Sequence, residues 1–213
     1  MTYSTILLTS FIVSLSAAIM PGPMLSMTIS QASRRGFFTG PLFVAGHGVL
    51  ELILVIALML GLGPILRLNL VFIATAIIGS GFLLWMSLGM MRSLPNLSMR
   101  NGNMQRDGTS PFVSGAVLSI LNPYWTIWWV SVGLGYITQT LQLGIWAVVV
   151  FFCGHILADL TWYSLVSWGV WKGSPFISDR LYRWIIGVCA SFLVVFAALF
   201  AYNGIARLFS YLK

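Results

Sequence analysis

Long apolar stretches are the feature that most constrains the fold of this chain. Apolar residues make up 59% of the sequence and charged residues only 7%, which excludes an ordinary soluble domain. A helix needs about 20 predominantly apolar residues to cross the hydrocarbon core of a bilayer. Six segments approach or exceed that length: 4–33, 41–63, 70–91, 111–136, 143–170 and 182–206. The sequence therefore predicts an all-α integral membrane protein with six transmembrane helices.

The net charge of +7 follows the connections between these segments. The first, third and fifth connections carry most of the basic residues: Arg34, Arg35, Arg92, Arg100, Arg106, Lys172, Arg180 and Arg183. The opposite side carries only Arg67, Arg207 and Lys213. Basic residues concentrate on the cytoplasmic side of membrane proteins. We therefore expect a multi-pass protein of the inner (plasma) membrane with both termini outside the cytoplasm. The charge indicates topology, and no nucleic-acid partner is expected.

One polar stretch divides the chain into halves. The segment from Arg92 to Ser110 is rich in Asn, Gly, Ser and charged residues, as is typical of a flexible linker. We predict a first three-helix repeat at 1–92, a cytoplasmic linker at 93–110 and a second three-helix repeat at 111–213. Because each half has an odd number of spans, the second half enters the membrane from the opposite side, and the repeat is predicted to be inverted.

Proline interrupts the first and the fourth apolar segments, at Pro21-Gly22-Pro23 and at Asn122-Pro123. A proline within a helix removes a donor and clashes with the carbonyl four residues back. The carbonyls of Ala17, Ile19 and Ser119 are therefore expected to lose their helical partners. A plain kink is the alternative, but matched interruptions in two halves are typical of transporter binding sites.

Each break also predicts the start of a new half-helix. The N–H groups of Met24 and Leu25, and those of Tyr124 and Trp125, would then be free and suited to a carboxylate. Trp125 is expected to wall a substrate pocket, where its ring face could contact an ammonium group.

Both histidines of the chain lie within apolar segments, each four residues before an acid: Gly46-His47-x-x-x-Glu51 and Gly154-His155-x-x-x-Asp159. Residues four apart lie on one face of a helix, about one turn from each other. An ionisable group at the centre of a membrane helix costs roughly 3 kcal/mol or more, so such groups are rarely incidental. Each pair is expected to titrate as a unit, as a proton carrier requires.

Two other interpretations of these pairs stay open. A static buried ion pair could hold the second and fifth helices together. Alternatively, two imidazoles and two carboxylates suit a divalent metal such as zinc or manganese, although the chain has no His-Glu-x-x-His motif and no third ligand cluster.

With these residues the chain resembles the lysine exporter (LysE) superfamily of small amino-acid exporters. The resemblance covers nearly the whole chain and rests on Pro21-Gly22-Pro23, Arg34-Arg35-Gly36, the Gly-containing second segment, the basic central loop and Asn122-Pro123. It implies six helices and proton-driven export of amino acids or similar small solutes. An acidic residue is familiar at the position of Glu51, whereas His47, mirrored by His155 and Asp159, departs from the usual pattern. Related branches of the superfamily handle heavy-metal ions.

The leading prediction is a proton-coupled exporter, working as an antiporter, of amino acids or related small zwitterionic solutes. The predicted substrate-binding residues are Pro21, Gly22, Pro23, Asn122, Pro123 and Trp125. The predicted proton-coupling residues are His47, Glu51, His155 and Asp159. An exporter of divalent metal cations, with the same four residues as ligands, is the first alternative, and an intramembrane metal-dependent hydrolase is a remote one.

No catalytic residue and no cofactor is predicted, because the chain lacks a recognisable nucleophile or metal-protease motif. The expected partners are the lipid bilayer, the small-molecule substrate and protons. Six short helices form a small bundle, so a homodimer is a further expectation.

Overall fold

The chain folds into a bundle of helices. The computed structural model describes residues 1–98, 109–173 and 176–212, and within these ranges it contains helices and no strand. The first half contains α1 (Tyr3–Ala18), α2 (Pro23–Arg35), α3 (Thr39–Ala57), the π-helical turn η1 (Leu58–Leu62), α4 (Gly63–Leu66), α5 (Asn69–Ser93) and the 3₁₀ turn η2 (Leu94–Asn96). The second half contains α6 (Pro111–Ile120), α7 (Pro123–Trp128), the π-helical turn η3 (Trp129–Gly133), α8 (Leu134–Leu141), α9 (Ile145–Gly173) and α10 (Asp179–Leu212).

The six predicted apolar segments correspond to these helices, and four of them form helical runs of membrane-spanning length, one of which is kinked at Gly61. Among the described residues, the helical runs long and apolar enough to cross a bilayer alone are Thr39–Leu66, Asn69–Asn96, Ile145–Gly173 and Asp179–Leu212. α1 and α2 together form a fifth candidate, bent by 76° at Pro21-Gly22-Pro23. The predicted all-α membrane protein is confirmed.

The fourth segment is interrupted twice. α6 ends at Ile120 and α7 begins at Pro123, and the turn η3 then separates α7 from α8. α6 alone is a short apolar helix, so this segment does not form one straight span. The first and fourth segments thus break at proline, as the sequence predicts, whereas six crossings arranged as two inverted repeats stay a prediction.

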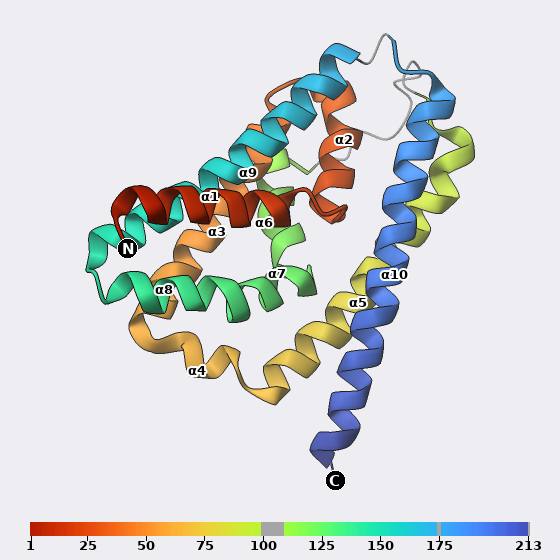
Figure 1. Ribbon diagram of the computed structural model, residues 1–213. Helices are drawn as coiled ribbons and strands as arrows, with labels where there is room; N and C mark the ends of the chain where they lie inside the picture. The colour runs from red at the N-terminus through yellow and green to blue at the C-terminus, as the bar shows by residue number, and fades with distance from the viewer. Residues whose placement is uncertain (99–108, 174–175, 213) are drawn as a thin grey trace.

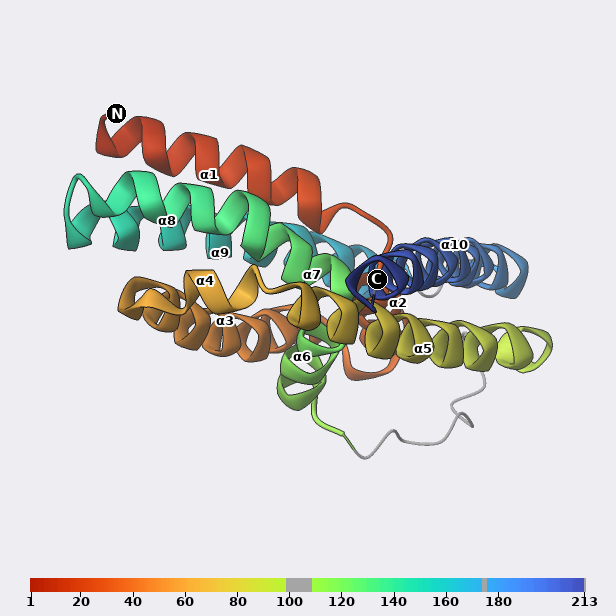
Figure 2. The ribbon, with the colours of Figure 1, turned by 90° about the horizontal axis from the view of Figure 1, so that it is seen from below.

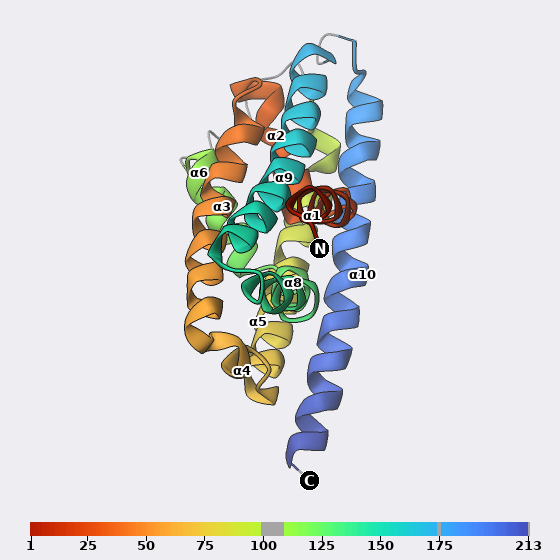
Figure 3. The ribbon, with the colours of Figure 1, turned by 60° about the vertical axis from the view of Figure 1, so that its left-hand side comes forward.

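Helices of one half of the chain pack mainly against helices of the other half (Figures 1 and 2). α1 of the first half lies against α9 of the second, α3 lies against α6, and α5 lies along α10. α3 and α9 also contact each other, as Figure 3 shows from the side. Residues 1–92 and 111–213 therefore share one bundle, in which each predicted repeat supplies the packing neighbours of the other.

α3 illustrates why the ionisable residues lie inside this bundle. Its buried face includes His47 and Glu51, while Val49, Ile53 and Ile56 are exposed. Exposed apolar side chains suit a helix that faces lipid, because hydrocarbon does not penalise them. Ionisable side chains at the same depth are placed toward the bundle interior, where partners offset the cost of removing them from water.

The glycines before the two histidines are among those that allow close approaches between the halves. A methyl group at Gly46 of α3 would overlap the carbonyl oxygen of Phe112 in α6, and one at Gly154 of α9 would overlap Ser10 and the carbonyl oxygen of Leu7 in α1. Small residues let membrane helices pack backbone to backbone. The glycine of each Gly-His motif therefore brings the following histidine directly against a helix of the other half.

The basic residues gather toward one end of the bundle. The C-terminal ends of α2, α5 and α9 and the first turns of α10 lie toward the top of Figure 1, away from both termini and α4. These elements carry Arg34, Arg35, Arg92, Lys172, Arg180 and Arg183. Most of the linker predicted at 93–110, including Arg100 and Arg106, lies outside the described residues, as does Lys213. The charge distribution agrees with the predicted topology, and its orientation stays a prediction.

The close approach at Gly154 can be tested by Gly154→Ala. The added methyl group should force α9 away from α1 and lower the free energy of unfolding by about 1–3 kcal/mol, as overpacking usually does. Gly169→Ala, on the same helix, is the matched control because a methyl group there meets nothing within 4 Å. Thermal unfolding of the purified protein in detergent compares the two; equal stability of both variants would contradict this packing.

Candidate functional site

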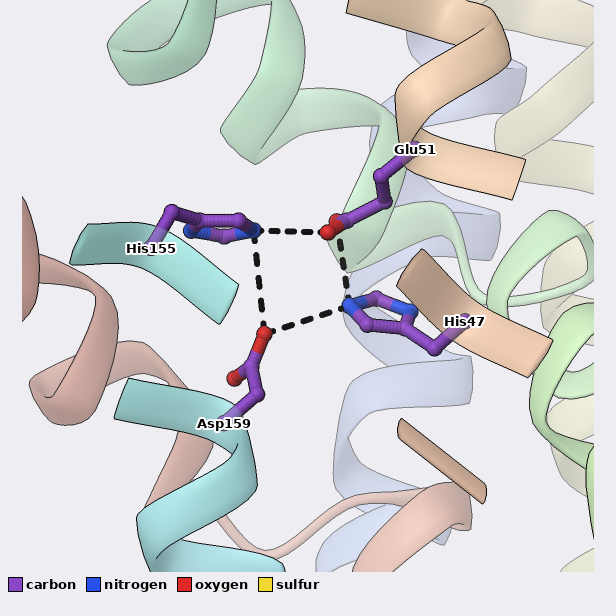
Figure 4. A group of neighbouring side chains, drawn as sticks. All are labelled: His47, Glu51, His155 and Asp159. Carbon is purple, nitrogen blue, oxygen red and sulfur yellow. Dashed lines mark hydrogen bonds and ion pairs between the residues drawn. The ribbon is translucent and has the colours of Figure 1, made fainter. Parts of the chain in front are cut away.

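The two His–acid pairs meet in one buried cluster between α3 and α9 (Figure 4). Nε2 of His47 lies 3.0 Å from Oε1 of Glu51 and 3.4 Å from Oδ2 of Asp159. Nε2 of His155 lies 2.7 Å from Oε2 of Glu51 and 3.7 Å from Oδ2 of Asp159. Each histidine therefore faces the acid of its own helix and the acid of the other half. All four side chains are buried, and Glu51 is only 1% exposed.

A serine from the opposite half orients each imidazole. Nδ1 of His47 lies 2.6 Å from the hydroxyl of Ser119 in α6, and Nδ1 of His155 lies 2.6 Å from the hydroxyl of Ser14 in α1. The Ser119 hydroxyl donates its proton to the carbonyl of Gly115 at 2.7 Å. Because a hydroxyl has one proton, Ser119 must accept from Nδ1–H of His47. Nε2 of His47 is thereby directed at the two carboxylates.

Two tryptophans hold Glu51 in place. Nε1–H of Trp125 in α7 and Nε1–H of Trp129 in η3 both donate to Oε1 of Glu51, at 2.9 and 2.8 Å. An indole N–H can only donate, so this oxygen serves as an acceptor, and a proton placed on it would displace one of its donors. Trp128 stacks on the ring of His155, with ring centroids 4.7 Å apart. The cluster is thus enclosed by the segment that follows the second proline break.

Asp159 is held less firmly than Glu51. Its Oδ2 makes no hydrogen bond to any described residue, although Asp159 is 5% exposed and both imidazoles lie within 4 Å. Buried polar atoms usually have a partner, and one without a partner calls for an explanation. The two halves therefore contribute acids with different surroundings.

The cluster borders a cavity of about 80 Å³ whose walls also include Ser14, Ser119, Trp125 and Tyr163. A second cavity of about 60 Å³ adjoins the two breaks and is lined by Pro21, Gly22, Pro23 and Asn122, among others. The two cavities share wall residues: Ala17, Met24, Asn122, Tyr124 and Tyr163. The proline breaks and the His–acid cluster are therefore neighbouring parts of one region, and both cavities are small in this conformation.

The structure separates the six predicted substrate residues. Pro21, Gly22, Pro23 and Asn122 line the cavity at the breaks, and Trp125 lines the cavity at the cluster. Pro123 is buried beside Gly79 of α5 and does not line either cavity. Trp125 also donates its N–H to Glu51, and contact of its ring face with an ammonium group stays a prediction.

The backbone at the second break differs from the expectation. The Asn122 side chain accepts from the N–H of Tyr124 at 3.1 Å, and the Asn122 carbonyl accepts from the N–H of Trp125 at 3.0 Å. These N–H groups are therefore not free, because asparagine caps the helix that starts at Pro123. Gly22 makes no side-chain cap at the start of α2, so the N–H groups of Met24 and Leu25 remain the candidate anion site.

The carbonyls at the breaks also find partners. The carbonyl of Ala17 accepts from the N–H of Met20 at 3.2 Å, and that of Ser119 accepts from the N–H of Asn122 at 3.1 Å. A tightened last turn thus satisfies carbonyls that the prolines leave without an i+4 donor. These two expected open acceptors are not available to a solute.

Sequence reasoning missed Ser14, Ser119 and Trp129. The two serines lie four residues after Ser10 and Gly115, on the small-residue faces that receive α9 and α3. Trp125 and Trp129 are four residues apart and so share one helix face. Both spacings are visible in the sequence, but which helix faces which cannot be read from it.

The comparison with known families agrees with this architecture. The family model of the LysE type translocators matches residues 15–204, which is most of the chain and includes both breaks and both His–acid pairs. No curated protein and no solved structure matches significantly. By this match, the chain belongs to the LysE type translocator family.

Proposed function

We propose that this protein is a proton-coupled exporter of amino acids or related small zwitterionic solutes. Membership in the LysE type translocator family supports membrane export of such solutes. The observation that carries the proton coupling is the buried cluster of two histidines and two acids, which lies next to the cavity at both proline breaks. The family consists of transporters, which favours transport over the hydrolase considered as a remote alternative.

The solute would bind at the breaks. The first N–H groups of a helix have no intrahelical acceptor, and Gly22 adds no side-chain cap to α2. The N–H groups of Met24 and Leu25 would therefore receive the carboxylate of the solute. Asp159, whose Oδ2 lacks a hydrogen-bond partner among the described residues, would face its ammonium group through the adjoining cavity.

Protons would bind at the cluster. Each imidazole contacts both acids, so a proton that arrives or leaves changes the charge of the whole group and not of one residue. In a region of low dielectric such a change is costly unless the surrounding donors rearrange. The cluster can therefore link the movement of a proton to a change in structure.

Hydrogen bonds connect the cluster to both broken segments. Ser14 of α1 contacts His155, and Trp125 of α7 and Trp129 of η3 donate to Glu51. A proton on Oε1 of Glu51 would release one indole and loosen α7 from α3. The protonation state of the cluster would in this way bias the segments that surround the solute, as an antiporter requires.

The predicted topology completes the proposal. The helix ends that carry most of the described basic residues lie toward one end of the bundle (Figure 1). This supports a plasma-membrane protein with that end in the cytoplasm and both termini outside. The packing of helices of one half against helices of the other supports two inverted repeats. We also propose a homodimer, because the helical bundle is small.

Replacement of both acids tests the coupling directly. In proteoliposomes with an imposed pH gradient, Glu51→Gln combined with Asp159→Asn should abolish gradient-driven accumulation of amino acids. The amino acids to test are those that the native protein exchanges in counterflow. Asp179→Asn, which removes an acid at the start of α10, is the matched control and should leave accumulation unchanged. Undiminished gradient-driven flux in the double variant would refute proton coupling through this cluster.

The role of the indole donors can be tested by Trp129→Phe. This change keeps an aromatic ring but removes one N–H bond to Glu51, and a hydrogen bond to a charged group contributes about 1.5–3 kcal/mol. We expect gradient-driven flux to fall by about tenfold or more. Trp146→Phe is the control because Trp146 is 70% exposed and makes no hydrogen bond to Glu51. Equal flux in both variants would show that Trp129 does not position Glu51.

A further inference from the structure

We propose that His47, Glu51, His155 and Asp159 form a binding site for one divalent transition-metal ion of the zinc type. This inference deepens the proposed function, on which it rests for the place of the cluster in the transport region, by naming a cation that this region can bind. The residues contribute one ligand atom each, and these four atoms all lie within 4.8 Å of one another.

The separations between these atoms approach those of a tetrahedral site. Zinc lies about 2.0–2.2 Å from its nitrogen and oxygen ligands, so neighbouring ligand atoms in a regular tetrahedron are about 3.3 Å apart. Nε2 of His155 lies 2.7 Å from Oε2 of Glu51, and Oδ2 of Asp159 lies 3.4 and 3.7 Å from Nε2 of His47 and of His155. The 3.0 Å contact of His47 is made with the other Glu51 oxygen, Oε1. An ion at the centre of the ring in Figure 4 would therefore require only small side-chain adjustments.

The imidazoles are oriented as metal ligands are. Metal-binding histidines direct one ring nitrogen at the ion and bond the other to a polar group that fixes the ring. Here both Nδ1 atoms contact serine hydroxyls and both Nε2 atoms point into the cluster. Since Nδ1 of His47 must donate to Ser119, the neutral form of this ring presents the lone pair of Nε2 to the centre.

The acids are also arranged to receive a cation. Trp125 and Trp129 bond Oε1 of Glu51, the oxygen that also faces Nε2 of His47. These bonds orient the carboxylate and leave Oε2 to act as the ligand. Oδ2 of Asp159 is buried, has no hydrogen-bond partner among the described residues and points into the same space. A coordinated ion would satisfy this atom.

Charge and ligand type select the kind of ion. Two carboxylates balance the charge of one divalent cation, so the occupied site with neutral imidazoles carries no net charge in a region where an uncompensated charge is costly. Two imidazole nitrogens favour zinc-type ions over magnesium or calcium, which prefer sites made of oxygen alone.

The test is binding of Zn²⁺ to the purified full-length protein in detergent after treatment with a chelator. Equilibrium dialysis with metal analysis should find one Zn²⁺ per chain, and Co²⁺ in its place should give the visible absorption of a tetrahedral complex with nitrogen and oxygen ligands. Binding should weaken by more than tenfold in Asp159→Asn and in His155→Gln, and remain unchanged in Asp179→Asn.

Ser119→Ala keeps all four ligands and separates loss of binding from loss of folding. Without its serine, His47 is no longer fixed, and the affinity for Zn²⁺ should fall by roughly 10–100-fold, as is typical when a group that orients a ligand is removed. Helix content by circular dichroism and elution in size-exclusion chromatography should match those of the native protein.

Three results would overturn the metal site. They are less than one Zn²⁺ per native chain, undiminished binding in Asp159→Asn and His155→Gln, or a Co²⁺ spectrum with thiolate bands that vanish in a Cys153→Ser, Cys189→Ser variant. Solute counterflow in chelator keeps the two proposals distinct. Flux without Zn²⁺ binding rejects the metal site alone, whereas Zn²⁺ binding without amino-acid flux rejects the proposed export function.

Discussion

The arrangement of this protein depends on keeping four ionisable side chains away from lipid and in contact with one another. His47 and Glu51 come from α3, and His155 and Asp159 come from α9. Either pair alone would leave a costly group within hydrocarbon. Placed face to face, each imidazole contacts two acids, and Glu51 contacts both imidazoles. This requirement fixes which faces of α3 and α9 turn inward.

The surrounding helices serve the same requirement. Gly46 and Gly154 let α6 and α1 approach closely enough for Ser119 and Ser14 to reach the imidazoles. The break before α7 turns the chain so that Trp125 can reach Glu51 from another direction. The breaks are thus more than kinks, because they place polar groups of both halves around one buried region.

Much of this could be predicted from local sequence. The apolar segments, the proline breaks and the i, i+4 pairing of His47 with Glu51 each depend on residues near one another in the chain. The capping of Tyr124 by Asn122 also follows from local rules, yet the expectation of free N–H groups overlooked the asparagine side chain. The contact between the two His–acid pairs could not be predicted. His155 and Glu51 are 104 positions apart in the chain, so their contact depends on how α3 and α9 pack.

The most direct test of the contact between the two His–acid pairs uses the small number of glutamate and histidine residues in the chain. Glu51 is its single glutamate, and it has two histidines, so isotopic labels on the glutamate carboxyl carbon and the histidine ring nitrogens report on this cluster alone. Solid-state NMR of the protein in lipid bilayers should show the Glu51 carboxyl group close to Nε2 of both histidines. A contact with the histidine of its own helix and none with His155 would contradict the account.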